Sequence, residues 1–201
     1  MDYLEALGAA VGLLYLWLEY KASIYVWVTG IIMPAIYIFV YYRAGLYADF
    51  AINIYYVIAA AYGLAMWRRK TSQEIGGGCE KVGACKSENQ SDRIIHTPVR
   101  LYPTLLAAFA LLFAAIGILL ESCTDSDVPW WDSFTTALSI VAMYMLAHKH
   151  AEQWLAWILV DAVCCGLYIY KGLYATSALY ALYTVIAVAG YRAWAKQAAT
   201  V

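Results

Sequence analysis

Seven long apolar segments fix what this chain can fold into. A bilayer needs about twenty apolar residues for each helix that crosses it, and most of the segments are near that length. None alternates every second residue, as the strands of a membrane barrel would. The sequence therefore predicts an all-α integral membrane protein with seven transmembrane helices, at 3–18, 24–42, 50–67, 101–120, 131–147, 154–170 and 177–194.

Composition supports a membrane protein. Hydrophobic residues make up 64% of the chain and charged residues 13%, whereas soluble domains carry about 25% charged residues. The net charge of −1 implies no nucleic-acid partner. The N-terminus lacks the positive region of a cleavable signal, so the first segment is expected to stay as a membrane helix. The spacing of the five cysteines fits neither a disulfide framework nor a zinc site, and no cofactor is implied.

The basic residues predict the orientation. If the long polar stretch 68–100 lies in the cytoplasm, 11 of the 13 lysines and arginines are inside, and only Arg43 and Lys171 are outside. The loop 121–132 carries four acidic and no basic residues, as an outside loop would. The positive-inside rule then places the N-terminus outside and the C-terminus inside. The stretch 68–100 is poor in large apolar residues and is predicted to be a flexible cytoplasmic linker.

The chain also repeats itself, since the segment from Trp27 to Trp67 matches the segment from Trp154 to Trp194 without a gap. The match pairs identical residues along both copies: Trp27 with Trp154, Tyr41 with Tyr168, Gly45-Leu46-Tyr47-Ala48 with Gly172-Leu173-Tyr174-Ala175, Ala51 with Ala178, Tyr56 with Tyr183, Ala60 with Ala187, Gly63 with Gly190, and Trp67 with Trp194. We expect the glycine of the repeated Gly-Leu-Tyr-Ala turn to provide a tight backbone between two helices.

The repeat predicts the domain organisation. It gives a first three-helix repeat at 1–67, the linker at 68–100, a linking transmembrane helix at 101–120 and a second three-helix repeat at 130–196, a 3+1+3 arrangement. Each repeat has three helices and one helix separates the repeats, so both repeats cross the membrane in the same direction. Parallel repeats of this kind are typical of small transporters with a substrate site between the halves. The copies differ at a few positions: Asp161 stands opposite Pro34, Trp157 opposite Gly30, and Tyr180 opposite Asn53. Such differences suit an asymmetric substrate.

The segment from Trp154 to Asp161 is the strongest candidate site. Trp154, Trp157 and Asp161 are spaced i, i+3 and i+7, so they share one face of a helix. An acid within an apolar segment must face protein or water rather than lipid. Two indoles and a carboxylate on one stripe could hold a flat aromatic cation. The alternative is that the tryptophans are interfacial anchors and Asp161 hydrogen-bonds a neighbouring helix.

These residues resemble the Pnu family of vitamin transporters, which share the fold of full-length SWEET proteins. The resemblance rests on the family pattern Trp-x-x-Trp-x-x-x-Asn/Asp at Trp154, Trp157 and Asp161, on Gly45 to Asp49, and on Lys171 to Tyr174. It implies that the Trp-Trp-Asp residues line a vitamin site. It further implies facilitated diffusion of an unphosphorylated vitamin across the bacterial inner membrane, trapping by phosphorylation afterwards, and assembly as a homotrimer.

The sequence leaves two cations as candidate cargoes. Because Asp161 is an acid where nicotinamide riboside carriers more often have an amide, thiamine is narrowly favoured and nicotinamide riboside is the alternative; another branch carries riboflavin. With Asp161 the one clear intramembrane acid, no proton relay is evident, so a uniporter is predicted. Further candidate contacts are Asn53, Tyr37, Tyr41, Tyr56, Tyr168 and Tyr183, although most tyrosines in a chain with 19 of them serve packing or the interface.

Three other classes of function fit the sequence less well. A membrane-embedded metalloenzyme would use His148, His150 and Glu152, but i, i+2 neighbours do not share a helix face. These residues are expected to form a solvated cytoplasmic turn. A scaffolding protein would not need the Trp-Trp-Asp stripe, and a channel would need more polar residues along a pore. No catalytic or metal-binding residue is therefore predicted.

Overall fold

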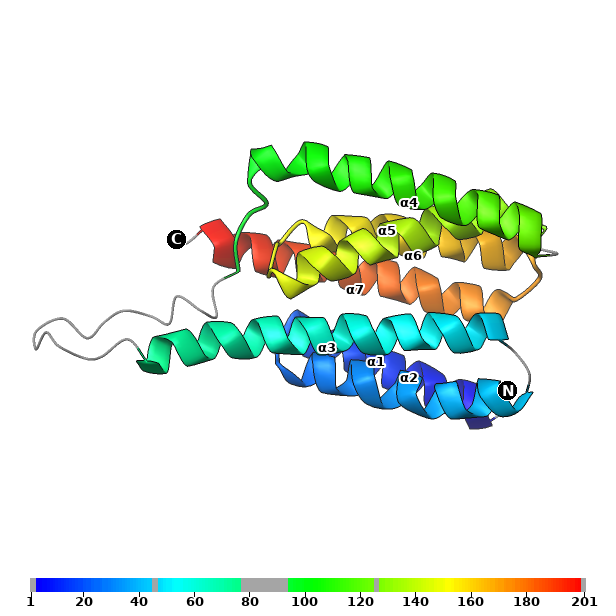
Figure 1. Cartoon of the computed structure of the whole chain (residues 1–201), viewed down its shortest axis with the longest axis horizontal. Helices are drawn as coiled ribbons and strands as arrows, with labels where there is room; N and C mark the ends of the chain where they lie inside the picture. Colours follow the sequence, from blue (N-terminus) through cyan, green and yellow to red (C-terminus); the bar gives the residue numbers. More distant parts are fainter. Residues whose placement is uncertain (1–2, 45–46, 77–93, 125–126, 200–201) are drawn as a thin grey trace, which may run out of the picture. The chain divides into compact units, whose positions relative to one another are not determined.

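The computed structural model describes residues 3–44, 47–76, 94–124 and 127–199, and in these residues the regular structure is helical apart from one isolated bridge. Figure 1 shows the helices in chain order. A single 3₁₀ turn, Val99–Leu101, precedes α4. The helices are α1 (Tyr3–Tyr20), α2 (Tyr25–Ala44), α3 (Tyr47–Gly76), α4 (Tyr102–Cys123), α5 (Pro129–Ala147), α6 (Gln153–Tyr170) and α7 (Tyr174–Ala199).

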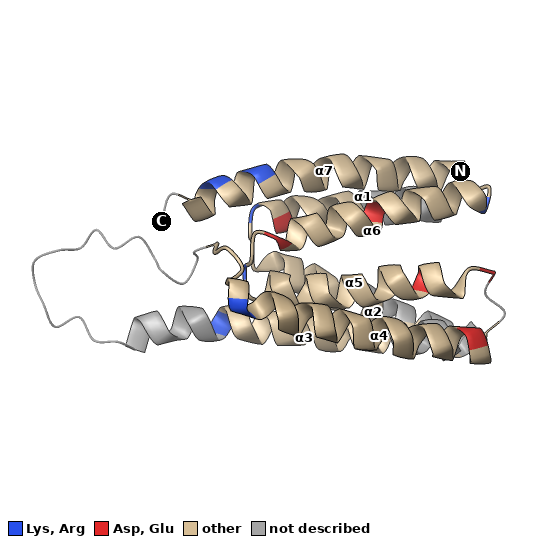
Figure 2. Ribbon diagram, turned by 90° about the horizontal axis from the view of Figure 1, so that it is seen from above, with Lys and Arg blue, Asp and Glu red and all other residues tan. Residues whose placement is uncertain are grey.

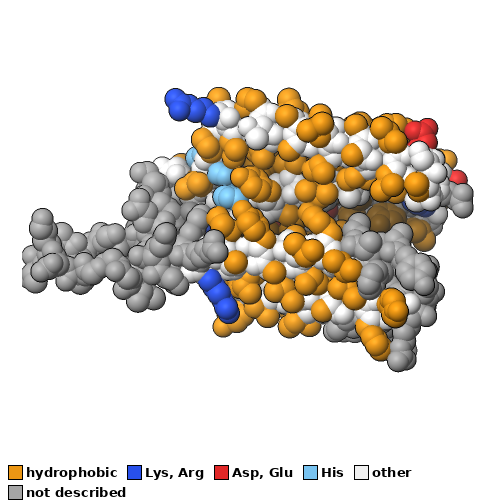
Figure 3. Space-filling view, in the orientation of Figure 1, with side chains coloured by type: hydrophobic (Ala, Val, Ile, Leu, Met, Phe, Trp, Pro, Cys, Tyr) orange, Lys and Arg blue, Asp and Glu red, His pale blue; other side chains and the backbone are white. Residues whose placement is uncertain are grey.

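Several helices have the length and composition of membrane spans. Among the described residues, Val99–Cys123, Gln153–Tyr170 and Tyr174–Ala199 are long and apolar enough to cross a bilayer. On α4, Leu106, Leu111 and Ile118 are largely exposed, and hydrophobic side chains are spread along the visible surface of this helix (Figure 3). Such a face is suited to lipid rather than water. The prediction of an all-α membrane protein is confirmed.

The chain divides into two compact units. The first comprises Met1–Arg93 with Ala147–Lys149, and the second comprises Ile94–Leu146 with His150–Val201. In the first unit, the buried Trp27 of α2 meets Trp67 of α3 edge-on, with ring centroids 5.6 Å apart at 84°. A Cβ added to Gly63 of α3 would lie 2.3 Å from the Trp27 ring. The glycine therefore lets α3 approach the indole closely.

The second unit has the same arrangement at the residues that the repeat pairs with these. Trp154 of α6 meets Trp194 of α7 edge-on, with centroids 5.7 Å apart at 88°, and a Cβ on Gly190 would lie 2.7 Å from the Trp154 ring. Such tryptophan pairs contribute about 0.5–1.5 kcal/mol beyond the area they bury. The repeated tryptophans and glycines thus form equivalent packing contacts in the two units.

The turns repeat as well. Ala22 has φ 48°, and Lys149, which stands at the same place in the second copy, has φ 60°. The following amide closes each helix in the same way: Ser23 N–H donates to Leu18 O at 2.9 Å and His150 N–H to Met145 O at 3.0 Å. This bond from C″ to C3, with a left-handed residue between, is the Schellman helix ending.

The Gly-Leu-Tyr-Ala turn of the second half ends α6 in the same way. Gly172 has φ 74°, and Leu173 N–H donates to Tyr168 O at 2.8 Å. A Cβ on Gly172 would meet nothing within 4 Å, so the backbone angle, and not lack of space, requires glycine. The predicted structural role of Gly172 is confirmed; its counterpart Gly45 lies outside the described residues.

The linker boundaries differ from those expected. Helix α3 continues past Trp67 to Gly76, since polar residues such as Arg68 can extend a helix beyond the lipid. At the other end, Ile94 and Thr97 are buried, and Ile95 forms a parallel bridge with His150. Residues 77–93, including Cys79 and Cys85, lie outside what the structure describes. The predicted linker is thus structured at both of its described ends.

Candidate functional site

Helix α6 places Trp154, Trp157 and Asp161 on its buried side. Trp154 is 0% exposed and Asp161 is 6% exposed, and Trp157 is half-buried. On the opposite side Leu155 and Leu159 are 45% and 48% exposed. The polar and aromatic side chains therefore face protein while leucines face outward, which is the pattern of a membrane helix. Asp161 is the one charged residue of α6 and stands near the middle of its sequence; Figure 2 shows where acidic and basic residues lie along the helices.

The contacts of Trp154 are those of a packing residue. Its ring fills the space over Gly190 and abuts Trp194, as described above. Both indole faces are covered, since the residue is fully buried. Its predicted contact with cargo stays a prediction, and the observed packing suits a residue that holds α6 against α7.

Asp161 lies beside a group of tyrosines. Its carboxylate is close enough to Tyr180 and Tyr183 to act on both electrostatically. Among the described residues, no hydrogen bond to this carboxylate is found. The ring of Tyr180 is 5.0 Å from that of Tyr168 and 5.6 Å from that of Tyr183, centroid to centroid. The structure therefore brings Tyr168, Tyr180 and Tyr183 together, with Asp161 within electrostatic range of Tyr180 and Tyr183.

Tyr180 links that group, and sequence reasoning did not select it. The sequence does contain an indication of its role: Tyr180 pairs with Asn53 in the repeat, and it stands three residues before Tyr183 on the same helix. Residues spaced i, i+3 are neighbours on a helix surface. A second residue that was missed is Gln153, the first residue of α6, whose side chain is fully buried.

Several buried polar atoms of α6 have no hydrogen-bond partner in the described part of the chain. They are Nε1 of Trp154, Nε1 of Trp157, and both Oε1 and Nε2 of Gln153. Buried polar atoms in folded proteins are nearly always hydrogen-bonded, so each exception needs an explanation. A bound polar solute or water molecules would satisfy them.

The remaining predicted residues belong to the first unit. Asn53 of α3 is half-buried, and the ring of Tyr56 lies 5.6 Å from that of Tyr55. Tyr37 and Tyr41 lie on α2, but their side chains are outside what the structure describes. Their predicted roles as cargo contacts stay predictions.

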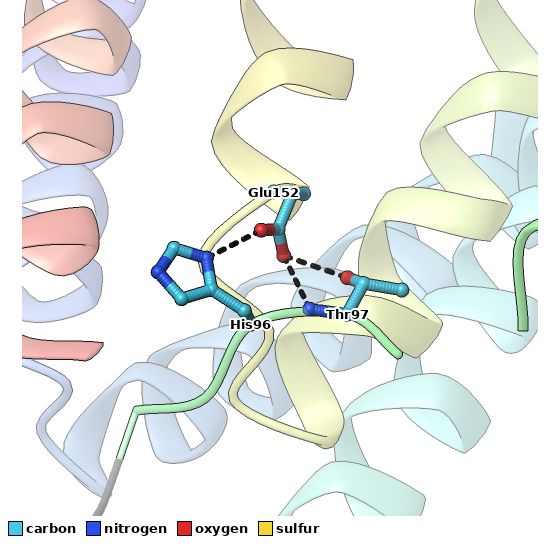
Figure 4. Close-up of polar contacts among 3 residues, drawn as sticks. All are labelled: His96, Thr97 and Glu152. Carbon is cyan, nitrogen blue, oxygen red and sulfur yellow. Dashed lines mark hydrogen bonds and ion pairs between the residues drawn. The ribbon is translucent and has the colours of Figure 1, made fainter. Parts of the chain in front are cut away.

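The start of α6 is fixed by Glu152. As Figure 4 shows, the carboxylate accepts hydrogen bonds from the segment before α4: from Nδ1 of His96 and from both the backbone N–H and the hydroxyl of Thr97, each at 2.7 Å. Burial acts to raise the pKa of Glu152, but the bonds from His96 and Thr97 outweigh it and hold the pKa below its ordinary value.

The turn between α5 and α6 is buried, contrary to the expected solvated turn. Lys149, His150 and Ala151 are almost fully covered. Ala151 N–H donates to Ile95 O at 2.9 Å. Within the first unit, the ammonium of Lys149 lies 4.4 Å from the centroid of the Trp67 ring, and Trp67 Nε1 donates to Ala147 O at 3.1 Å. These contacts cover the charge and the backbone of the turn.

The described residues contain no group of three or more His, Cys, Asp or Glu side chains that could hold a metal ion. Glu152, one of the three residues considered for such a site, binds His96 and Thr97 instead. The candidate site on α6 is made of a carboxylate, aromatic rings and buried hydrogen-bonding groups that have no partner in the described part of the chain.

Comparisons with known proteins show the family of this chain. A family described as "Nicotinamide mononucleotide transporter" matches residues 2–196. The nicotinamide riboside transporter PnuC of Escherichia coli is 26% identical over 208 residues, which cover 98% of this chain and 87% of the relative. The riboflavin/roseoflavin transporter RibM of Streptomyces davaonensis is 25% identical over 191 residues, covering 94% and 83%.

A solved structure shares the fold. The crystal structure of the vitamin B3 transporter PnuC superposes with a TM-score of 0.67 at 24% identity, over 96% of this chain and 80% of that one. At this identity the likeness establishes the fold.

Proposed function

Since this chain belongs to the family of nicotinamide mononucleotide transporters, we propose that it carries nicotinamide riboside across the membrane. The observation that carries the proposal is the buried Asp161 beside Tyr180 and Tyr183. Nicotinamide riboside is a flat pyridinium cation without a phosphate. A buried carboxylate compensates its charge, and aromatic rings provide faces for it.

The riboside suits the site better than the mononucleotide. A phosphate group would bring additional negative charge next to Asp161, and α6 carries no lysine or arginine to offset it. Relatives described as nicotinamide riboside transporters in Escherichia coli and in Neisseria mucosa support the same choice.

Thiamine, which Asp161 narrowly favoured in the sequence, loses its place as first choice. None of the relatives named above is a thiamine transporter, and two kinds of cation satisfy one carboxylate equally well. The acid at position 161 is therefore compatible with the pyridinium charge of nicotinamide riboside.

The proposal extends to how the carrier works. The two copies form parallel three-helix repeats joined by α4, with the SWEET-like arrangement, the N-terminus outside, and assembly as a homotrimer. The turns and tryptophan pairs that recur in the second copy support the repeat. Uptake is by facilitated diffusion, because an inside-negative potential already favours entry of a monovalent cation by about 2.3 kcal/mol per 100 mV.

Binding to the purified protein tests the proposal. Titration with nicotinamide riboside, nicotinamide mononucleotide and thiamine should show the tightest binding for the riboside. Asp161→Ala should weaken that binding about thirtyfold or more, since truncating one partner of a buried charge pair costs at least roughly 2 kcal/mol. Asp127→Ala, at an exposed acid, is the matched control. Equal binding by wild type and Asp161→Ala would refute the role of the carboxylate.

A further inference from the structure

Gln153 is the most unusual buried side chain of α6. It is 0% exposed, yet neither Oε1 nor Nε2 has a hydrogen-bond partner among the described residues. An amide that gives up its water without forming new hydrogen bonds destabilises the protein, so such side chains are rare. Its presence calls for a ligand that supplies the missing bonds.

The position of Gln153 connects it with the candidate site. Gln153, Trp157 and Asp161 are spaced i, i+4 and i+8, so they follow one another along one face of α6. Together with Trp154 they fall within an arc of about 100° around the helix. Nε1 of Trp157 is also buried without a partner. One face of α6 therefore carries Asp161 together with buried polar atoms of Gln153 and Trp157 that have no hydrogen-bond partner among the described residues.

The internal repeat shows that packing does not require an amide here. The residue that the repeat pairs with Gln153 is Val26, which is also 0% exposed. The same buried position thus accepts an apolar side chain in the first unit. Gln153 joins Trp157 and Asp161 as a residue that differs between the copies at an otherwise equivalent place, and these differences are where an asymmetric cargo would be recognised.

We propose that Gln153 is a specificity-determining contact that binds the carboxamide of the cargo, a role that rests on the proposed transport of nicotinamide riboside. A glutamine amide donates through Nε2 and accepts through Oε1. A primary carboxamide offers the complementary donor and acceptor, whereas a carboxylate would face Oε1 with a second acceptor. Asp161 and Trp157 bind the pyridinium ring, and Gln153 reads the neutral substituent on it.

Two ribosides test the proposal. Nicotinamide riboside and N-ribosylpyridinium share the cation and the sugar, but the second lacks the carboxamide. Wild-type protein should prefer nicotinamide riboside by at least about tenfold, because the preferred ligand pairs groups that the other leaves buried and unpaired. Gln153→Met and Gln153→Val should bind the two ribosides equally. Leu155→Met, at an exposed position of the same helix, should keep the wild-type preference.

Thermal unfolding of the ligand-free protein separates recognition from structure. Both Gln153 variants should unfold at the same temperature as wild type or higher, since an unpaired buried amide has been removed. A preserved preference in the variants overturns the proposal and leaves the proposed function standing. If the variants lose binding of both ribosides equally and also unfold at a lower temperature, the proposal is overturned too, because Gln153 would then be structural. If wild type binds neither riboside, the proposed function fails and the proposal with it.

Discussion

The close contact between Trp154 and Gly190 makes that glycine a critical residue. Gly190→Ala would place a Cβ 2.7 Å from the ring of a fully buried tryptophan, which has no room to move aside. Overpacking of this kind costs about 1–3 kcal/mol. We expect a clearly lower thermal unfolding temperature in detergent.

Gly166→Ala is the matched control for that substitution. Gly166 lies on α6, and a Cβ there would meet nothing within 4 Å. Because alanine favours helix over glycine, this variant should be as stable as wild type or more so. Equal unfolding temperatures for Gly190→Ala and Gly166→Ala would mean that the tryptophan does not depend on the glycine.

Sequence reasoning found some residues of the candidate site and missed others. The spacing of Trp157 and Asp161 placed them on one helix face, because helical periodicity alone decides that. Gln153 was missed because a glutamine in the first turn of a helix is usually solvated, and only tertiary packing buries it. Tyr180 was missed because 19 tyrosines hide the few that form a cluster.

At the scale of elements, Glu152 ties the segment before α4 to the start of α6. Its pKa is lowered below the ordinary value of 4.5, so its ionised form stabilises the fold. Glu152→Gln should therefore lower the unfolding temperature at neutral pH, because it removes charge-assisted bonds from His96 and Thr97.

The pH dependence of that difference follows from the direction of the shift. A carboxyl with a lowered folded-state pKa contributes stability that is fully present above its unfolded-state pKa and lost as pH falls through the folded-state pKa. Unfolding temperatures of wild type and Glu152→Gln should differ at pH 6–7 and converge as the pH falls below 4.5. A difference that persists unchanged at acid pH would contradict this account.

The α5–α6 turn shows why tertiary contacts escape local patterns. His148, Lys149 and Glu152 resemble a solvated turn in sequence, because each is polar. The structure buries the turn because Ile95 pairs with His150 and Glu152 binds Thr97, contacts between parts of the chain that are far apart in sequence. Charge alone does not reveal such a partner in the sequence.

For the whole molecule, the orientation can be tested on a native cysteine. Cys123 is an exposed free thiol at the end of α4, next to the loop predicted to lie outside. In the second unit, α4 begins after Arg100 and carries Glu121 near its other end, and Figure 3 shows visible basic and acidic side chains toward opposite ends of this unit. A membrane-impermeant maleimide should therefore label this protein in intact cells.

Cys123→Ser provides the control for that labelling. It should abolish labelling of intact cells, while the cysteines of the predicted cytoplasmic stretch, Cys79 and Cys85, should react only after the cells are permeabilised. Labelling of Cys79 or Cys85 in intact cells that carry Cys123→Ser would reverse the predicted orientation.

The sequence predicted the class of the molecule better than its cargo. Apolar segments and a gap-free repeat are long-range signals that many residues share, so the all-α membrane fold and the recurring Trp27 and Trp154 contacts could be anticipated. The cargo was ranked on a single residue, Asp161, and one carboxylate does not distinguish thiamine from nicotinamide riboside.

Uptake into sealed proteoliposomes tests the central claim most directly. Labelled nicotinamide riboside should enter until its concentration is equal on both sides, without an ion gradient, and labelled nicotinamide mononucleotide should stay outside. An inside-negative potassium diffusion potential should raise the plateau for the cation. No uptake of the riboside, or uptake only with an imposed proton or sodium gradient, would contradict a facilitated-diffusion carrier for nicotinamide riboside.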